Sequence, residues 1–194
     1  MGLLDVFSGA GAKGLRKAKG ISHQGRRLSD ILEAHRKFHL GQPGGVRADL
    51  TGADLSHADL RGSDLTGAIL TGCILREADL RGAKLGSADL SQSNLRKADL
   101  RSCDFTGVNL ERANLTEADL SGTELFRGDL SHAILHKAIL RGTVLRQAIL
   151  RGADLSGADL TNASFREIDL TDVTLDGADL RNAVVRDNQK PQPK

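Results

Sequence analysis

The sequence predicts a solenoid, a rod of stacked coils in which the chain turns a corner every five residues. A bulky apolar residue occupies every fifth position from Leu50 to Val185, and this central residue is Leu everywhere else except at Phe105 and Phe165. A small residue, usually Ala, stands two positions before each centre. A period of five fits neither a helix, with 3.6 residues per turn, nor a strand, which alternates every two residues. A chain that bends once per pentad does keep all the centres on one side.

The pentads read A-D-L-x-x, as in Ala48-Asp49-Leu50, and they resemble those of the pentapeptide-repeat family over about 140 of the 194 residues. The resemblance implies an all-β fold: a right-handed quadrilateral β-helix with four pentads per coil, the central and small residues inward and the other three outward. The twenty-eight pentads would then form about seven coils. Alternating large and small side chains fills a narrow core without voids. Glycine suits the second corner position where φ is positive, as expected at Gly52, Gly62, Gly82, Gly122, Gly142 and Gly152.

The sequence divides into four predicted segments. Residues 1–25 are rich in Gly and Lys and are expected to form a flexible basic arm. Residues 26–46 contain a capping helix and a linker, and residues 47–187 form the β-helix. Residues 188–194, with two prolines, are expected to be a disordered tail.

A helix is predicted from Leu28 to His39, with Ser29 as its N-cap. The first coil of a solenoid exposes unpaired backbone and core side chains, which a terminal cap normally covers. The apolar face of this helix is therefore expected to cover the first coil through three side chains, Ile31, Leu32 and Phe38.

Composition argues against several functions. Five Phe and no Trp or Tyr provide no aromatic platform for nucleic acid, although the basic arm leaves direct nucleic-acid binding as a minor alternative. No apolar run reaches transmembrane length and no secretory segment is recognised, which favours a cytoplasmic protein that does not bind membranes.

Cys73 and Cys103 both occupy inward small positions and are expected to be free and buried. A convex rod filled with Leu offers no cavity for catalysis, so no enzyme activity, metal or cofactor is predicted.

Residues twenty apart should stack on neighbouring coils, which turns the outward residues into columns. One acidic column contains the candidate partner residues Asp59, Asp79, Asp99 and Asp119. Arg61, Arg81 and Arg101 follow two positions later, on or beside the same face. We interpret this arrangement as a self-neutralising face rather than a ligand site, because stacked like charges would otherwise repel.

The position just before the centre, called here the pre-centre position, is normally Asp or Asn. In four successive pentads, which together circle the rod once, it is apolar and β-branched: Ile134, Ile139, Val144 and Ile149. These four residues, called here the belt, are a candidate partner surface. Their β-propensity alone is the competing explanation.

The sequence therefore predicts a non-enzymatic binding or scaffold protein that presents a rigid rod to an unidentified protein partner. The family resemblance implies an alternative, a DNA mimic that inhibits or protects a type II topoisomerase such as gyrase. The repeat carries 17 basic against 22 acidic residues, a net charge of −5. A duplex of similar length carries on the order of twenty charges, which weakens this alternative.

The C-terminal coil is a candidate dimer interface. Ile168 and Val173 place large side chains at inward positions that are normally small, but they leave the edge backbone uncovered. Val184 and Val185 are therefore expected to contact a second copy of the chain. The adjacent Arg186 and Asp187 would either pair across that interface or block it.

Overall fold

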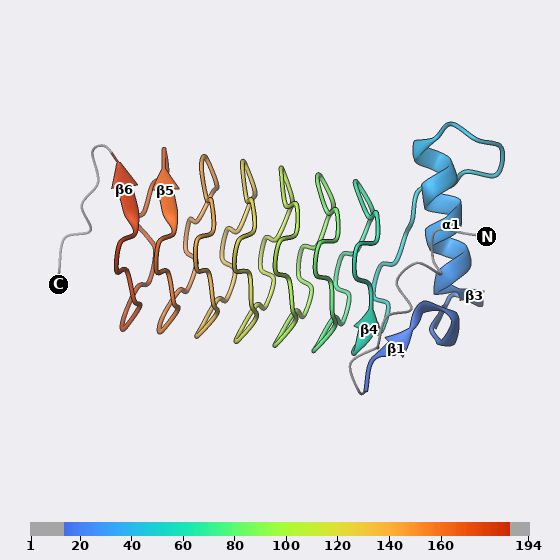
Figure 1. The fold of residues 1–194 in the computed structure, drawn as a ribbon, viewed down its shortest axis with the longest axis horizontal. Helices are drawn as coiled ribbons and strands as arrows, with labels where there is room; N and C mark the ends of the chain where they lie inside the picture. The colour runs from blue at the N-terminus through green and yellow to red at the C-terminus, as the bar shows by residue number, and fades with distance from the viewer. Residues whose placement is uncertain (1–13, 187–194) are drawn as a thin grey trace.

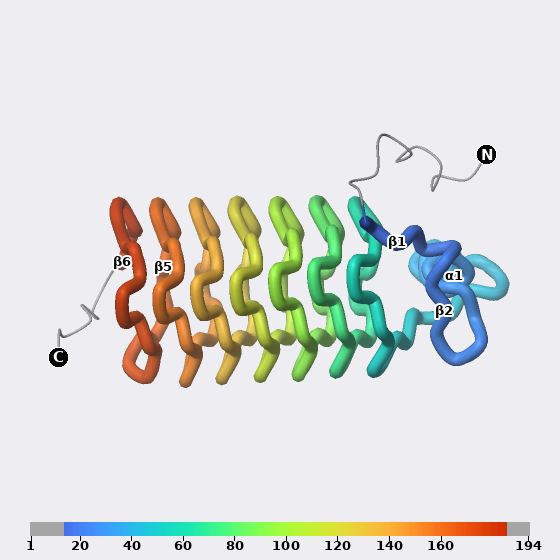
Figure 2. The backbone as a smooth tube through the Cα atoms, turned by 90° about the horizontal axis from the view of Figure 1, so that it is seen from below, coloured from blue at the N-terminus to red at the C-terminus, as the bar shows by residue number. Residues whose placement is uncertain are grey.

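The computed structural model describes residues 14–186, and these form a rod of stacked coils with a helix at one end (Figure 1). Parallel β-bridges join residues twenty apart, such as Asp59 with Asp79, and recur every five residues along the chain. Each coil therefore takes up four pentads. Seen from a second direction, the coils lie side by side along the whole axis (Figure 2).

Regular strands are short because the chain turns after every pentad. Within the rod they are β4 (Ala58–Asp59), β5 (Ser164–Arg166) and β6 (Val184–Arg186), and β5 pairs with β6 in parallel. Elsewhere the coils are held by single bridges and by a regular ladder of backbone hydrogen bonds. In this ladder the Leu100 N–H donates to the Asp119 carbonyl at 2.8 Å, and the Asp99 N–H donates to the Ala78 carbonyl at 2.9 Å.

The core runs down the centre of the rod. Every central residue from Leu50 to Phe165 is at most 2% exposed, and nearly all of the small residues are buried with them. The inward assignment of centres is thus confirmed over this range. Burial weakens in the last coil, where Leu175 and Leu180 are only partly buried and Val185 is exposed.

The corners explain two features of the repeat. All six glycines expected at the second corner position have φ between +60° and +69°, which confirms the prediction. Non-glycine residues such as His57 and Gln92, each with φ +58°, adopt the same conformation elsewhere. The pre-centre carboxylate accepts a hydrogen bond from the backbone N–H two residues later, as Asp54 Oδ1 does from Ser56 N at 3.0 Å. This local bond accounts for the recurrent Asp.

Helix α1 spans Leu28–His39, as predicted, but its N-cap is Arg27 rather than Ser29. The strand β3 (Arg26–Arg27) leads into α1 in an extended conformation, so the N-cap lies two residues earlier than expected. The Ser29 hydroxyl instead donates to Asp30 Oδ1 at 3.2 Å.

Helix α1 packs against the core of the rod, although not through all the predicted side chains. Ile31 and Leu32 are buried in the core, as expected, together with Leu28. Phe38 is a correction, because its ring is 48% exposed. A Cβ built on Gly45 would lie 2.5 Å from the Phe38 backbone nitrogen, so the returning loop occupies the space beside the last helical turn. The ring remains outside.

The predicted flexible arm is wrong for residues 14–25, which form a second part of the cap. The strand β1 (Arg16–Lys17) pairs in parallel with β4, and the Arg16 N–H donates to the His57 carbonyl at 2.6 Å. The short helix η2 (Ala18–Gly20) follows, and then β2 (Ser22–His23) pairs antiparallel with β3. Ile21 anchors this segment in the core at 1% exposure. The unpaired edge of the first coil explains why this Gly-rich segment is ordered.

The rest of the predicted arm, residues 1–13, and the predicted tail, residues 188–194, lie outside the described residues. Within residues 14–186, no helix has the length and apolar character needed to cross a membrane.

Candidate functional site

The predicted columns of Asp and Arg come together as a ladder of ion pairs along one face. Arg61 contacts Asp59 at 2.8 Å and Asp79 on the next coil at 3.6 Å. Arg81 likewise joins Asp79 at 2.6 Å to Asp99 at 3.4 Å. Each arginine thus bridges two stacked carboxylates, and the predicted self-neutralising face is confirmed here.

The ladder continues with a change of partner. Arg101 contacts Asp99 at 2.6 Å and Asp119 at 3.7 Å. Where the next arginine would stand, the Ser121 hydroxyl donates to Asp119 Oδ1 at 2.6 Å. Ile139 then interrupts the acidic column, and Asp159 beyond it receives Arg141 at 2.5 Å.

These contacts favour the ionised form of two of the carboxylates, those of Asp59 and Asp99. The hydrogen bonds from Arg61 hold the pKa of Asp59 below its ordinary value. Burial alone would raise the pKa of Asp99, but the hydrogen bonds and charge of Arg101 outweigh it, and the net shift is downward. A face in which each negative charge is already paired has little potential left to attract a basic partner.

The belt has a different character. Ile134, Val144 and Ile149 are exposed, and Ile139 is partly exposed. Residues 130–153 contain no Asp or Glu at all. The pentads on either side keep the usual local bond, with Ser131 N donating to Asp129 at 2.8 Å and Ser156 N to Asp154 at 2.9 Å. An aliphatic side chain cannot accept this bond, so the belt replaces a repeated stabilising contact with exposed apolar surface.

Phe126 is a surface residue that the sequence analysis missed. It occupies the first corner position after Leu125, whereas Phe105 and Phe165 are buried centres. The guanidinium carbon of Arg127 lies 4.9 Å from the centre of its ring, and that of Arg146, from the next coil, lies 5.4 Å away. The pentad register alone would have shown that this Phe points outward.

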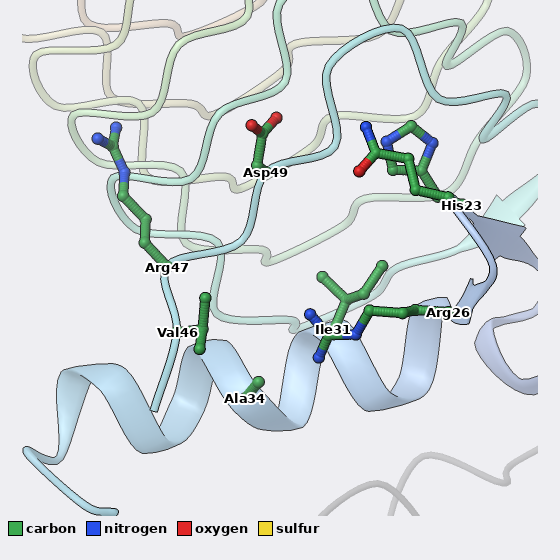
Figure 3. Close-up of a pocket in the computed structure, with 8 residues that line it drawn as sticks. His23, Arg26, Ile31, Ala34, Val46, Arg47 and Asp49 are labelled. Carbon is green, nitrogen blue, oxygen red and sulfur yellow. The ribbon is translucent and has the colours of Figure 1, made fainter. Parts of the chain in front are cut away.

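A pocket of about 110 Å³ lies between α1 and the first coil (Figure 3). Arg26, Arg47 and His23 line it together with Asp49, and Ile31, Ala34, Val46 and Gln24 complete the wall. Asp49 already accepts hydrogen bonds from both the N–H and the hydroxyl of Thr51, at 3.0 and 2.7 Å. The pocket is too small for a substrate of ordinary size.

Both cysteine thiols lie in the core rather than at the surface. Cys73 and Cys103 are free and buried, as predicted, and burial raises the pKa of each thiol to about 12. Their Sγ atoms donate to the carbonyls of Leu50 and Leu80, at 2.8 and 3.0 Å. In the part of the chain that the structure describes, no three metal-ligating side chains come together.

At the far end, the predicted dimer residues are exposed. Val184 is 38% and Val185 40% exposed, and both lie in β6, which pairs with β5 on one edge only within the described residues. The other edge of β6 carries no described strand.

Comparison with known proteins gives a consistent result. The model of the family described as pentapeptide repeats matches this chain in eight copies, over residues 48–86, 73–112, 83–122, 109–147 and 148–187. A search of curated proteins found no match.

Several solved structures are similar. HetL, a pentapeptide repeat protein involved in heterocyst differentiation regulation in the cyanobacterium Nostoc sp. strain PCC 7120, is 33% identical over 70% of this chain and 82% of its own, with a TM-score of 0.30. A pentapeptide repeat protein of the Arabidopsis thaliana thylakoid lumen is 30% identical over 62% of this chain and 70% of its own, with a TM-score of 0.35. QnrB1, a plasmid-mediated fluoroquinolone resistance protein, is 24% identical over 71% of each chain, with a TM-score of 0.38. The extent of the family match shows that this chain belongs to the pentapeptide-repeat family.

Proposed function

We propose that this protein is a non-enzymatic scaffold that binds a macromolecular partner through the surface of its rod. In this proposal the rod is a right-handed quadrilateral β-helix of about seven coils, capped at its first coil by α1 and β1. The cytoplasm is the proposed compartment, in keeping with two thiols that remain unpaired.

The belt is the observation that carries the proposal. Its four residues give up the hydrogen bond that Asp or Asn makes at the same position elsewhere, and they expose apolar surface instead. Its bridges to neighbouring coils are those of the other pentads, such as Asp119 with Ile139 and Asp129 with Ile149. The backbone therefore does not require β-branched residues at these sites. A local departure from the rule of the fold, without structural compensation, is typical of a functional surface.

The proposal is tested by returning the belt to the repeat pattern. A variant carrying Ile134→Asp, Ile139→Asp, Val144→Asp and Ile149→Asp should fold normally, because Asp occupies this position in most other pentads. Wild type and variant are immobilised side by side, and the proteins each retains from the native cell lysate are quantified. We expect at least one abundant protein to be retained by wild type and lost by the variant. Identical retained sets would remove the belt as the binding surface.

The topoisomerase-directed DNA mimic has less support. Its negative surface would have to include the acidic column, in which Asp59, Asp79 and Asp99 are each engaged by two arginines or by one bidentate arginine. QnrB1 is 24% identical to this chain, which is too little to support a shared function.

A further inference from the structure

One face of the belt combines its most exposed apolar residue with a cluster of cations. Ile149 is 50% exposed. Arg146 stands at the corner before it, in the preceding pentad, and Arg151 at the corner after it, in the same pentad as Ile149. On the preceding coil, Phe126 and Arg127 lie at the corner that stacks on that of Arg146. His132 lies at the corner that stacks on that of Arg151. We call these six residues the Ile149 face.

The charge of this region is opposite to that of the rod. Residues 126–151 contain five Lys or Arg, namely Arg127, Lys137, Arg141, Arg146 and Arg151, against the single acid Asp129, so five minus one gives +4. The repeat as a whole is at −5. Arg146 contacts Glu167 at 3.5 Å, whereas Arg151 forms no ion pair with any residue from 14 to 186. Positive potential therefore remains at the corners on both sides of Ile149.

The side chains of the Ile149 face are also held in place. The Phe126 ring lies under two guanidinium groups, and Arg127 Nε donates to Gln147 Oε1 at 3.0 Å. Cation–π contacts and this hydrogen bond restrict two arginines that would otherwise lose rotamer freedom on binding. Aromatic, arginine and aliphatic side chains exposed on adjacent coils have the composition of an interface hot spot.

The surroundings decide which anion fits. A nucleic acid needs a track of cations along its backbone, but Asp129 lies on the coil before Ile149, and Glu167 and Asp169 lie on the coil after it. These acids limit the positive surface along the rod axis to a narrow band. A short segment that crosses the rod at this coil meets cations at both corners and Ile149 between them. Carboxylates match the planar guanidinium in a bidentate manner.

We propose that the Ile149 face binds an acidic segment of a protein partner. Carboxylates of the partner pair with Arg146 and Arg151, and an apolar side chain of the same segment packs on Ile149 and Phe126. This inference rests on the proposed function, and it adds the class of the partner and the face that it uses.

The test converts the guanidinium groups of Arg146 and Arg151 into cross-linkable amines. The full chain with Arg146→Lys and Arg151→Lys keeps its charge, and each new amine forms an amide bond with an adjacent carboxylate after carbodiimide activation. The probe is the native lysate treated with nuclease and detergent, and the cross-linked peptides are sequenced by mass spectrometry. We expect a link from residue 151 to Asp or Glu of a partner protein. An internal link from residue 146 to Glu167 is the positive control.

Point variants give the second measurement. Ile149→Asp restores the repeat pattern and should lower retention of that partner by about tenfold or more, as expected for the loss of a hot spot. Ile69→Asp is the matched control, because Ile69 has the same pentad position on the same face, with Thr66, Gly67, Thr71 and Gly72 at its corners. It should leave retention unchanged. Circular dichroism melting confirms that both variants fold.

The outcomes separate the two proposals. If Ile134→Asp or Ile139→Asp releases the partner while Ile149→Asp does not, the scaffold function stands and the Ile149 face is wrong. Retention that depends on intact nucleic acid or on lipid, or a partner cross-linked only through residues outside this face, also overturns the inference. If wild type retains nothing that the fourfold belt variant loses, the proposed function fails as well.

Discussion

At the scale of single residues, buried and exposed positions of the repeat are immediate neighbours in the chain. Leu100 is fully buried, whereas Asp99 and Arg101 on either side of it form ion pairs at the surface. The chain alternates sharply because each pentad contributes only two side chains to a narrow core. The few polar side chains in this core are small and already bonded, as Ser93 and Thr123 donate to the carbonyls of Leu90 and Leu120.

Leu100→Asp should consequently be strongly destabilising. The substitution buries a carboxylate among apolar side chains with no hydrogen-bond partner. The free energy of unfolding should fall by several kcal/mol, whether the acid stays ionised or takes up a proton. Ser87→Asp is the control, because Ser87 is exposed and Asp tolerates its positive φ of +54°. Thermal melting should show a large decrease for the first variant and almost none for the second. Equal shifts would mean that inward and outward positions are wrongly assigned.

His35 is a second residue with a measurable role. Its ring is fully buried, and Nδ1 accepts a hydrogen bond from Ala48 N at 3.1 Å, which requires this nitrogen to be unprotonated. Nε2 lies 3.3 Å from His39 Nε2, which is 2.8 Å from the Thr66 carbonyl oxygen. Burial, and then the charges of His39 and Arg47, lower the pKa of His35, while Asp64 and the Thr66 carbonyl oppose them.

The cap should therefore loosen in acid. Because the folded-state pKa lies below the unfolded value of 6.5, the stabilisation by neutral His35 is fully present above about pH 6.5 and is lost as pH falls through the folded pKa. Protonation would also break the bond to Ala48. Hydrogen exchange, corrected for its intrinsic pH dependence, should show faster opening of the Ala48 amide at low pH in wild type. His35→Asn, which retains an acceptor but does not titrate, should remove this dependence, and His132→Asn at the surface should preserve it.

At the scale of elements, the cap joins two segments that come before the repeat. Helix α1 covers the core of the first coil, and β1 pairs with its edge at β4. The end of a solenoid needs both the covering of its core and the pairing of its edge, because apolar side chains and backbone groups are exposed there together. Ile21, between β1 and β2, connects the two parts through the core.

Ile21→Ala should loosen the cap without unfolding the rod. Removing a buried Ile side chain costs about 2–5 kcal/mol, and nearest-neighbour coupling in a solenoid confines the effect to the adjacent coil. Hydrogen exchange should increase across residues 16–28 and remain slow from residue 90 onward. Val46→Ala, at an exposed site, should change neither region. Uniform loss of protection along the chain would contradict a separable cap.

At the scale of the whole molecule, the rod differs from a DNA mimic in how its charge is arranged. The ladder from Asp59 to Asp119 alternates with arginines along the rod. A basic groove would therefore meet a nearly neutral surface over this face.

Purified gyrase should accordingly supercoil DNA at its normal rate in the presence of micromolar protein. The assay is run with wild type and with a variant carrying Lys at positions 59, 79, 99 and 119. Inhibition by wild type that disappears in the variant would make the topoisomerase alternative the leading function.

The C-terminal coil leads to a prediction about assembly. Exposed Val184 and Val185 and the open edge of β6 provide a template for a second copy, and identical ends that meet head-on close as a two-fold dimer. We expect light scattering to show a dimer of the full chain at tens of micromolar and a monomer after Val184→Lys and Val185→Lys. A wild-type monomer, or a dimer unaffected by the two lysines, would exclude this interface.

The sequence by itself determined the repeat and its surface. Because residues twenty apart stack on neighbouring coils, the pentad register placed the centres, the corner glycines, the stacked Asp and Arg columns and the belt. The site was therefore largely predictable, and Phe126 was missed only because its outward register was not used. Its contact with Arg146 lies between coils and is equally implied by the register.

Only the tertiary structure decided the arrangement of residues 14–46. No period links this segment to the coils, so the pairing of β1 with β4, the burial of Ile21 and the exclusion of Phe38 depend on contacts between distant parts of the chain. Glycine content favoured a flexible arm, but the open edge of the first coil offered hydrogen bonds that outweigh that preference. The repeat period specifies the structure wherever a coil has another coil on each side. The end of the rod has no repeat beyond it, so its structure is specified by packing between distant parts of the chain.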